Sequence, residues 1–142
     1  MKDHQLSGSV LLFIMLSMLI SGCLPRNSPD VGTSWTLDTL TVDGASIDIL
    51  TSHPITLEIR ENNGVGGSAG CNIYGGEVVF RAGGNLETRN LFQTEMWCEV
   101  GMDVEAAFLS ALNSVTHYEW DENTLTLSTS DIQTLLIFQV SE

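Results

Sequence analysis

The chain has 142 residues and a formal net charge of -13, because 18 acidic residues face only 5 lysines and arginines. This length predicts a single domain, since domains usually contain ~100–200 residues. The acidic balance excludes a nucleic-acid-binding protein, because phosphate recognition needs clustered basic residues. Hydrophobic residues make up 43% of the chain, which predicts a packed core and excludes a disordered acidic tail.

The N-terminus carries the features of an export signal. Residues 10–20 read VLLFIMLSMLI, a length typical of the apolar part of a secretory signal. A membrane-spanning helix would need ~20 apolar residues. The run is followed by Ser21-Gly22-Cys23, which resembles the lipobox of bacterial lipoproteins. The resemblance implies cleavage after Gly22 and lipidation of Cys23, while the alternatives are an uncleaved anchor or a buried helix.

The residue after Cys23 bears on localisation. An aspartate there tends to retain a lipoprotein at the inner membrane, so Leu24 favours the outer membrane, with the protein facing the periplasm. We expect a signal peptide over residues 1–22, the lipidated cysteine and a tether over 23–33, and one domain over 34–142. Cleavage after Gly22 would remove both Lys2 and Asp3, so the net charge of the mature chain would stay at -13. It should therefore stand off an anionic bilayer to which acyl chains attach it.

The two remaining cysteines, Cys71 and Cys98, form an even pair. An oxidising compartment allows a disulfide between them, worth ~3.5 kcal/mol on the chain-entropy estimate. The alternative is a pair of buried free thiols, which pack as small hydrophobic groups. A metal site is less favoured, because the sequence has no CxxC spacing and no nearby histidine cluster.

In chain order, the first half of the domain alternates apolar and polar residues, as half-buried strands do. Residues 35–42 predict a strand with a bulge or slip between Leu37 and Leu40, followed by a turn at Asp43-Gly44. Residues 55–59 predict a second strand, and Glu61-Asn62-Asn63-Gly64 predicts a turn.

The next segment, residues 65–81, is rich in glycine and predicts a strand interrupted by close backbone approach or by bulges. Residues 77–81 are β-branched and aromatic, which again favours a strand. A turn follows at residues 82–85, and residues 86–94 alternate once more, with an adjustment near Asn90.

The apolar period then changes to that of an amphipathic helix over residues 103–114. Asp103 is the expected N-cap, and Glu105 in the first turn suits the helix dipole. Alternation resumes over residues 117–120, 125–127 and 135–140. Strands on both sides of one helix predict a mainly β fold with one α-helix, in which a small antiparallel sheet is closed or nearly closed.

Gly70-Cys71-Asn72-Ile73-Tyr74-Gly75-Gly76 resembles the GCNxYxG signature of the META/HslJ family. Trp35-Thr36-Leu37 resembles the first strand of this family, and residues 94–98, TEMWC, resemble its T-x-M-x-C segment. Residues 105–112, EAAFLSAL, resemble its E-x-x-F-x-x-x-L helix. The resemblance covers roughly residues 34–140, and several spaced elements agree with the family in order.

The resemblance implies a small antiparallel β-barrel-like domain in the bacterial envelope, often carried on a lipoprotein. Family members are linked to heat response, to resistance to novobiocin-type antibiotics and to secretion or motility, and some look like lipid-binding secretin pilots. The cysteine positions of the family match Cys71 and Cys98, which supports the disulfide. Glycine freedom and local hydrogen bonding give the motif a structural role, which we assign to Gly70, Cys71, Asn72, Tyr74, Gly76, Met96 and Cys98.

No catalytic constellation is evident in the sequence, and we predict no enzyme activity, cofactor or metal. His53 and His117 are expected at the surface rather than as catalytic bases. The favoured function is a non-enzymatic envelope lipoprotein that acts in envelope stress or antibiotic tolerance through a protein partner. The alternative is a carrier or pilot that binds a small hydrophobic ligand or lipid inside the barrel. An enzyme is the third and weakest hypothesis.

Overall fold

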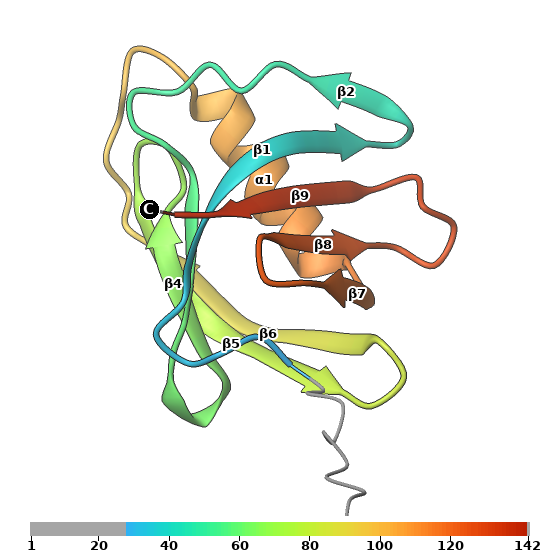
Figure 1. Cartoon of the computed structure of the whole chain (residues 1–142). Helices are drawn as coiled ribbons and strands as arrows, with labels where there is room; N and C mark the ends of the chain where they lie inside the picture. The colour runs from blue at the N-terminus through green and yellow to red at the C-terminus, as the bar shows by residue number, and fades with distance from the viewer. Residues whose placement is uncertain (1–27, 142) are drawn as a thin grey trace, which may run out of the picture.

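The computed structural model describes residues 28–141 (Figure 1). The predicted signal peptide and Cys23 lie outside these residues. The elements in chain order are β1 (Ser34–Val42), β2 (Ala45–Ile47), β3 (Thr56–Ile59), the short 3-10 turn η1 (Glu61–Asn63), β4 (Gly64–Ser68), β5 (Ile73–Arg81), β6 (Asn85–Gln93), α1 (Met102–Ser114), β7 (His117–Trp120), β8 (Thr124–Ser128) and β9 (Leu135–Val140).

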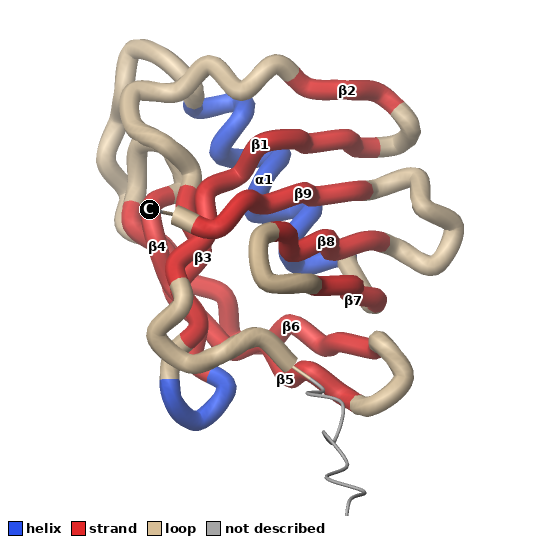
Figure 2. The backbone as a smooth tube through the Cα atoms, in the orientation of Figure 1, coloured by secondary structure: helices blue, strands red, loops and turns tan. Residues whose placement is uncertain are grey.

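The strands form one antiparallel sheet that closes on itself. Neighbouring strands pair in the order β2-β1-β3-β4-β5-β6-β7-β8-β9, and β1 also pairs with β9. Strand β2 pairs with β1 alone, so it extends one edge of β1 while the other strands make the barrel (Figures 1 and 2). The predicted fold class, mainly β with one α-helix and a closed antiparallel sheet, is confirmed for the described residues.

Strands β6 and β7 are connected by little backbone pairing. These strands are paired only through Asn85 and His117, so β6 from Leu86 to Gln93 has no strand on that side. Helix α1 packs there, and the Thr88 hydroxyl donates to the carbonyl oxygen of Leu112 at 2.9 Å. The helix thereby covers part of the β6 edge, which backbone pairing would otherwise have to satisfy.

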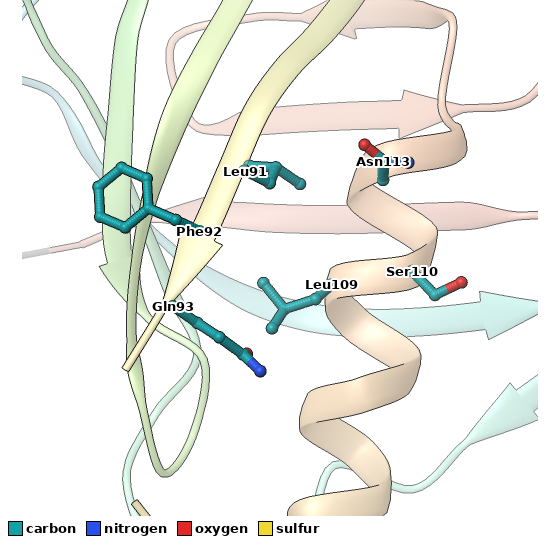
Figure 3. Close-up of a pocket in the computed structure, with 6 residues that line it drawn as sticks. All are labelled: Leu91, Phe92, Gln93, Leu109, Ser110 and Asn113. Carbon is teal, nitrogen blue, oxygen red and sulfur yellow. The ribbon is translucent and has the colours of Figure 1, made fainter. Parts of the chain in front are cut away.

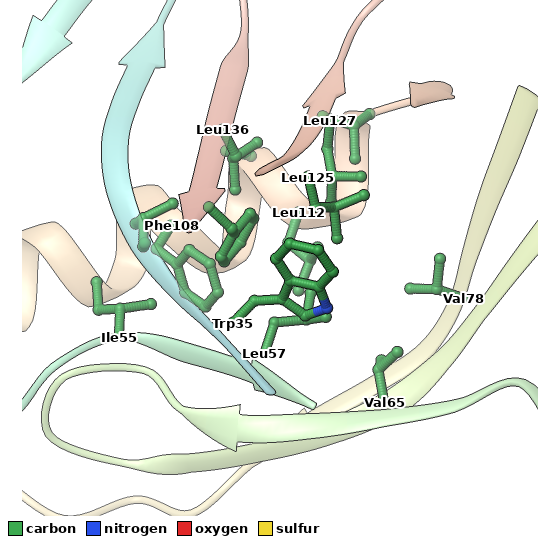
Figure 4. Packing of buried hydrophobic residues seen from close by; sticks show 14 of the residues in the cluster. Trp35, Ile55, Leu57, Val65, Val78, Phe108, Leu112, Leu125, Leu127 and Leu136 are labelled. Atoms are coloured by element: carbon green, nitrogen blue, oxygen red, sulfur yellow. The ribbon is translucent and has the colours of Figure 1, made fainter. Parts of the chain in front are cut away.

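The interior of the barrel is filled by side chains (Figure 4). Trp35 from β1, Leu57 from β3 and Leu125 from β8 point inward and are at most 1% exposed. Phe108 of α1 is fully buried and meets Phe138 edge to face, with the ring centroids 6.4 Å apart. These residues occupy the space in which a ligand carried inside the barrel would lie.

Two predicted irregularities are confirmed. The pairing of β1 with β9 shifts register between Leu37 and Thr39, which is the slip that the sequence pattern predicts. The pairing of β5 with β6 shifts between Gly75 and Glu77. On the β6 side of this shift, Asn90 has a φ of 52°. Each bulge increases strand curvature, which helps a small sheet to close.

The predicted start of the helix is wrong. The N-cap is Gly101, and Asp103 lies inside the first turn of α1 without capping it. Gly101 has a φ of +91°, and a Cβ there would lie 2.9 Å from the carbonyl oxygen of Leu50. A tertiary contact together with left-handed backbone therefore sets the start of the helix.

Two further features of the N-terminal half were not predicted. Strand β2, over Ala45–Ile47, continues the β1 hairpin beyond the expected turn. Gly32 donates its N–H to the carbonyl oxygen of Ile59, and Ile59 donates back to Thr33. The end of the segment expected to be a tether is thus hydrogen-bonded to β3, because its backbone extends the sheet by a short stretch.

Candidate functional site

The family-motif residues meet at one end of the barrel. There the turn between β4 and β5, residues 69–72, lies against the loop between β6 and α1, residues 94–101. Cys71 and Cys98 form a disulfide across this junction, with their Cα atoms 6.0 Å apart. The disulfide prediction is confirmed, and the alternatives of free thiols and of a metal pair are set aside.

Asn72 holds the loop by its side chain and is only 1% exposed. Its Oδ1 accepts hydrogen bonds from the backbone N–H of Met96 at 2.6 Å and from the hydroxyl of Thr94 at 2.8 Å. Its Nδ2 donates to the carbonyl oxygen of Met96 at 3.0 Å and to Oε1 of Glu105 at 2.7 Å. The buried amide is thus bonded through both its oxygen and its nitrogen, which such a group requires.

Glu105 connects the same turn to α1 and is 2% exposed. Its Oε2 accepts from the backbone N–H of Asn72 at 2.7 Å and of Cys71 at 3.2 Å, besides the bond from Asn72 Nδ2 to Oε1. Three N–H donors compensate for the loss of water around the buried carboxyl group. The role expected for Glu105 was at the helix dipole, and these contacts with the turn were not predicted. The available signal was an acid directly after Val104 and three residues before Phe108, on the buried face of the helix.

We call Cys71, Asn72, Cys98 and Glu105 the clamp. It joins three elements that are distant in the sequence, namely the β4–β5 turn, the loop 94–101 and α1. Gly70 permits the turn because its φ is +105°, and a Cβ there would lie 2.6 Å from Cγ2 of Thr51. The clamp thus fixes the backbone of the loop while leaving the loop side chains free to face outward.

Tyr74 anchors the strand that follows the clamp. The ring is 1% exposed and lies edge to face with Phe108, and its hydroxyl donates to the carbonyl oxygen of Thr56 at 2.9 Å. Burial raises the pKa of Tyr74 far above its ordinary value of 10.0, so the group stays neutral. A Cβ on Gly76 would lie 3.1 Å from the carbonyl oxygen of Arg89 and 3.2 Å from Cα of Leu91, so the β6 backbone leaves little space for a side chain there. Tyr74 and Gly76 thus take part in the packing of β5 against its neighbours.

Large hydrophobic side chains lie exposed around the clamp. Trp97 is 79% exposed and Phe92 69% exposed, and four smaller residues complete the set. We call this the Trp97 surface and define it as Leu50, Ile73, Phe92, Met96, Trp97 and Val100. Leu50 belongs to the loop before β3, which contacts loop 94–101 through the hydroxyl of Ser52 and the carbonyl oxygen of Val100, 3.4 Å apart. Monomeric proteins rarely leave large apolar side chains gathered in this way without a functional reason.

A groove of about 440 Å³ lies beside this surface, between β6 and α1 (Figure 3). Leu91 and Gln93 extend from β6 toward the helix, and Leu109 extends toward them from α1. Phe92 points to the other side of β6, where it packs over Gly75. The end of β6 therefore has a groove of mixed polar and apolar lining on one side and part of the Trp97 surface on the other.

His53 reaches the turn of the clamp through its backbone, because its N–H donates to the carbonyl oxygen of Gly70 at 3.0 Å. His53 is exposed in the loop before β3, and Nδ1 of His117, on β7, lies 2.9 Å from the hydroxyl of Thr116. Within residues 28–141, no three histidine, cysteine or acidic side chains are grouped as metal ligands would be. In the same described part, no helix has the length and apolarity needed to cross a bilayer.

A small closed antiparallel barrel with one packed helix and a disulfide-clamped loop defines the structural class of this protein. The family model of the META domain matches residues 29–142. The chain therefore belongs to the META domain family, and the suspected resemblance is confirmed. A comparison with curated proteins gives no match.

Solved structures share this fold. The NMR structure of a protein from Burkholderia xenovorans is 25% identical with a TM-score of 0.64, and the match covers 82% of this chain and 93% of that one. A second NMR structure is 21% identical with a TM-score of 0.56, covering 77% and 89%. The crystal structure of a DUF4847 family protein from Bacteroides vulgatus is 13% identical with a TM-score of 0.57, covering 77% and 92%. At these identities, the likeness supports the fold and no particular activity.

Proposed function

We propose that this META-domain protein is a non-enzymatic lipoprotein of the bacterial envelope that binds a protein partner. It is anchored through Cys23, faces the periplasm from the outer membrane, and contributes to envelope stress or antibiotic tolerance. The observation that carries the proposal is the Trp97 surface, because exposed aromatic side chains on a rigid backbone are typical of protein interfaces.

Two features support an envelope location. The lipobox-like Ser21-Gly22-Cys23 follows an apolar run of signal-peptide length. The disulfide between Cys71 and Cys98 suits an oxidising compartment such as the periplasm. The sequence feature and the disulfide are independent of each other, yet both favour export.

The packed interior weighs against the carrier alternative. Trp35, Phe108 and Phe138 occupy the barrel and are at most 1% exposed. A lipid would have to displace side chains that are packed at close to crystal density. We therefore favour partner binding at the outer surface over ligand carriage inside the barrel.

Mass spectrometry of the full chain, purified from membranes, tests the anchor. We expect a mature N-terminus at Cys23 with its mass increased by acyl chains, and loss of membrane attachment in Cys23→Ser. Serine retains the size of the side chain but cannot form the thioether. A mature chain that keeps residues 1–22, or that lacks acylation on Cys23, would contradict the lipoprotein proposal.

A further inference from the structure

The charged side chains of loop 94–101, which carries Met96, Trp97 and Val100, are all acidic. Glu95 and Glu99 are exposed in the same loop as Met96 and Trp97, and Asp103 is exposed in the first turn of α1 that follows this loop. After Arg89, the sequence contains no lysine or arginine. On the Phe92 side of the surface, the Arg60 guanidinium covers Gly66, which pairs with the Gly75 beneath Phe92, and it is already paired with Glu58 at 2.9 Å. The loop side of the surface therefore carries carboxylates, which attract cationic groups and repel acidic ones.

The position of the surface argues against docking to a membrane. The first described residues, Ser28 and Pro29, lie near Phe80 at the far end of β5, whereas Ile73 of the Trp97 surface begins that strand. Seven residues of strand separate the two ends by roughly 23 Å. In Figure 1 the chain enters beside the β5–β6 hairpin, and loop 94–101 lies at the opposite end of these strands. If the N-terminus is tethered to a bilayer, the surface is on the side away from the attachment point.

A second copy of the chain also fits poorly. Two Trp97 surfaces placed face to face would bring Glu95 and Glu99 of each copy close together, while the nearby Arg60 is already paired with Glu58. Like charges at an interface are costly. The occupant with complementary chemistry is a segment of another protein that combines apolar side chains with arginine or lysine.

We propose that the Trp97 surface docks a cationic, apolar segment of a partner protein, an inference that rests on the proposed partner-binding function. Trp97 offers a large exposed ring on which an arginine or lysine can stack. Met96 and Phe92 supply adaptable apolar contacts beside it. Glu95 and Glu99 pair with the remaining cationic groups at the rim. The clamp holds the backbone of loop 94–101, so the segment meets a surface that needs little ordering on binding.

Site-specific photocrosslinking in intact cells tests the proposal on the full chain. A photoreactive residue replaces Trp97 in one strain, and replaces Ile132 in a matched control. Ile132 is 66% exposed in the segment between β8 and β9, away from the clamp. We expect crosslinks from position 97 to one protein, and sequencing of the crosslinked peptide should find basic and apolar residues. Position 132 should give no such product.

The possible outcomes distinguish the inference about the docking surface from the broader proposal that the protein binds a partner. Crosslinks to a protein from position 132 but not from 97 would overturn the docking inference and keep a partner-binding function. Crosslinks from neither position would count against both. Products from position 97 that contain lipid, a second copy of the chain or an acidic peptide would also overturn the inference.

A charge-matched pair of variants tests electrostatic recognition. Glu95→Gln with Glu99→Gln removes two carboxylates beside Trp97. Glu119→Gln with Glu122→Gln removes the same charge from exposed positions on and after β7. With a crosslinker at Met96, we expect the first pair to lower the crosslinked yield at least about 10-fold and the second to leave it unchanged. An equal yield from both pairs would show that charge does not select the partner.

Discussion

Glu105 is a charged residue on the face that α1 turns toward the barrel. It contacts no lysine or arginine in the hydrogen bonds described above, and instead accepts three bonds from Cys71 and Asn72. Such a group holds its neighbours in place, because each of those N–H donors would otherwise be buried without an acceptor. We regard Glu105 as the residue on which the clamp depends most.

Replacement of Glu105 by alanine should therefore destabilise the protein. We expect Glu105→Ala to lower the free energy of unfolding by about 3 kcal/mol, since it leaves buried donors unsatisfied and opens a small cavity. Urea unfolding of the variant and the parent chain measures this difference. Glu119→Ala, at an exposed position, is the control and should change stability by less than about 0.5 kcal/mol. Equal effects of the two substitutions would show that the Glu105 bonds contribute little.

Glu87 illustrates a charged group with the opposite environment. It is exposed and lies between Arg89, whose nitrogens are 2.6 and 2.8 Å from its oxygens, and Arg81 at 2.9 Å. The hydrogen bonds from Arg89, then those from Arg81, lower the pKa of Glu87 from 4.5 to about 2. Because the folded pKa is depressed, the stabilising contribution is present above the unfolded value and is lost as the pH falls from about 4.5 toward 2.

An NMR titration of the Glu87 side chain tests this assignment. In the parent chain the carboxyl group should titrate near a pKa of about 2, and in Arg89→Gln the pKa should rise toward 4.5. Arg60→Gln is the matched control, because Arg60 pairs with Glu58 instead. A Glu87 pKa that is unchanged by Arg89→Gln would refute the pairing.

At the scale of elements, loop 94–101 is held by two kinds of bond. The disulfide is covalent and depends on the redox state, while the Asn72 bonds to Met96 persist without it. The disulfide closes a loop with a sequence separation of 27 residues. Its main effect in the chain-entropy model is to restrict the unfolded chain.

Loss of the disulfide should lower stability more than it disturbs the fold. We expect Cys71→Ser with Cys98→Ser to reduce the free energy of unfolding by about 3.5 kcal/mol. Thermal or urea unfolding with and without reductant measures this loss of stability. Reductant should destabilise the parent chain but not the double variant. If reductant leaves the parent unchanged at complete reduction, the cysteine pair contributes no stability.

The sequence predicted the elements whose signal is local. The slip between Leu37 and Leu40 and the irregularity near Asn90 are visible because apolar alternation fails where a bulge occurs. The start of α1 was not predictable in this way. Asp103 has good capping chemistry, but the close approach of the Leu50 carbonyl to Gly101 decides the boundary. Tertiary contacts of this kind leave no periodic trace in the sequence.

The candidate site was predictable in part. The residue types of the motif indicated a structural role, and the pairing of Cys71 with Cys98 followed from the cysteine count together with the family resemblance. The partners of Asn72 could not be predicted, because Glu105 is 33 residues away and its contact depends on how α1 packs. The exposure of Trp97 was equally hidden, since tryptophan is highly buried on average and its burial depends on the tertiary fold.

At the scale of the whole molecule, the protein consists of a packed barrel and the exposed Trp97 surface at one end of it. The packed barrel is rigid, and the bonds of the clamp hold loop 94–101 in a fixed position against it. Substitutions inside the barrel should therefore affect stability, whereas substitutions on the Trp97 surface should affect function alone. Trp97→Ala should change the unfolding midpoint little, because the side chain is 79% exposed.

The most direct measurement of the central claim is complementation of a strain that lacks this protein, under envelope stress or a novobiocin-type antibiotic. Full-length Trp97→Ala and Ile132→Ala are compared at equal levels in the membrane fraction, as both remove an exposed apolar side chain. The account predicts that Ile132→Ala restores survival to that of the parent chain and that Trp97→Ala does not. Full rescue by Trp97→Ala would contradict it.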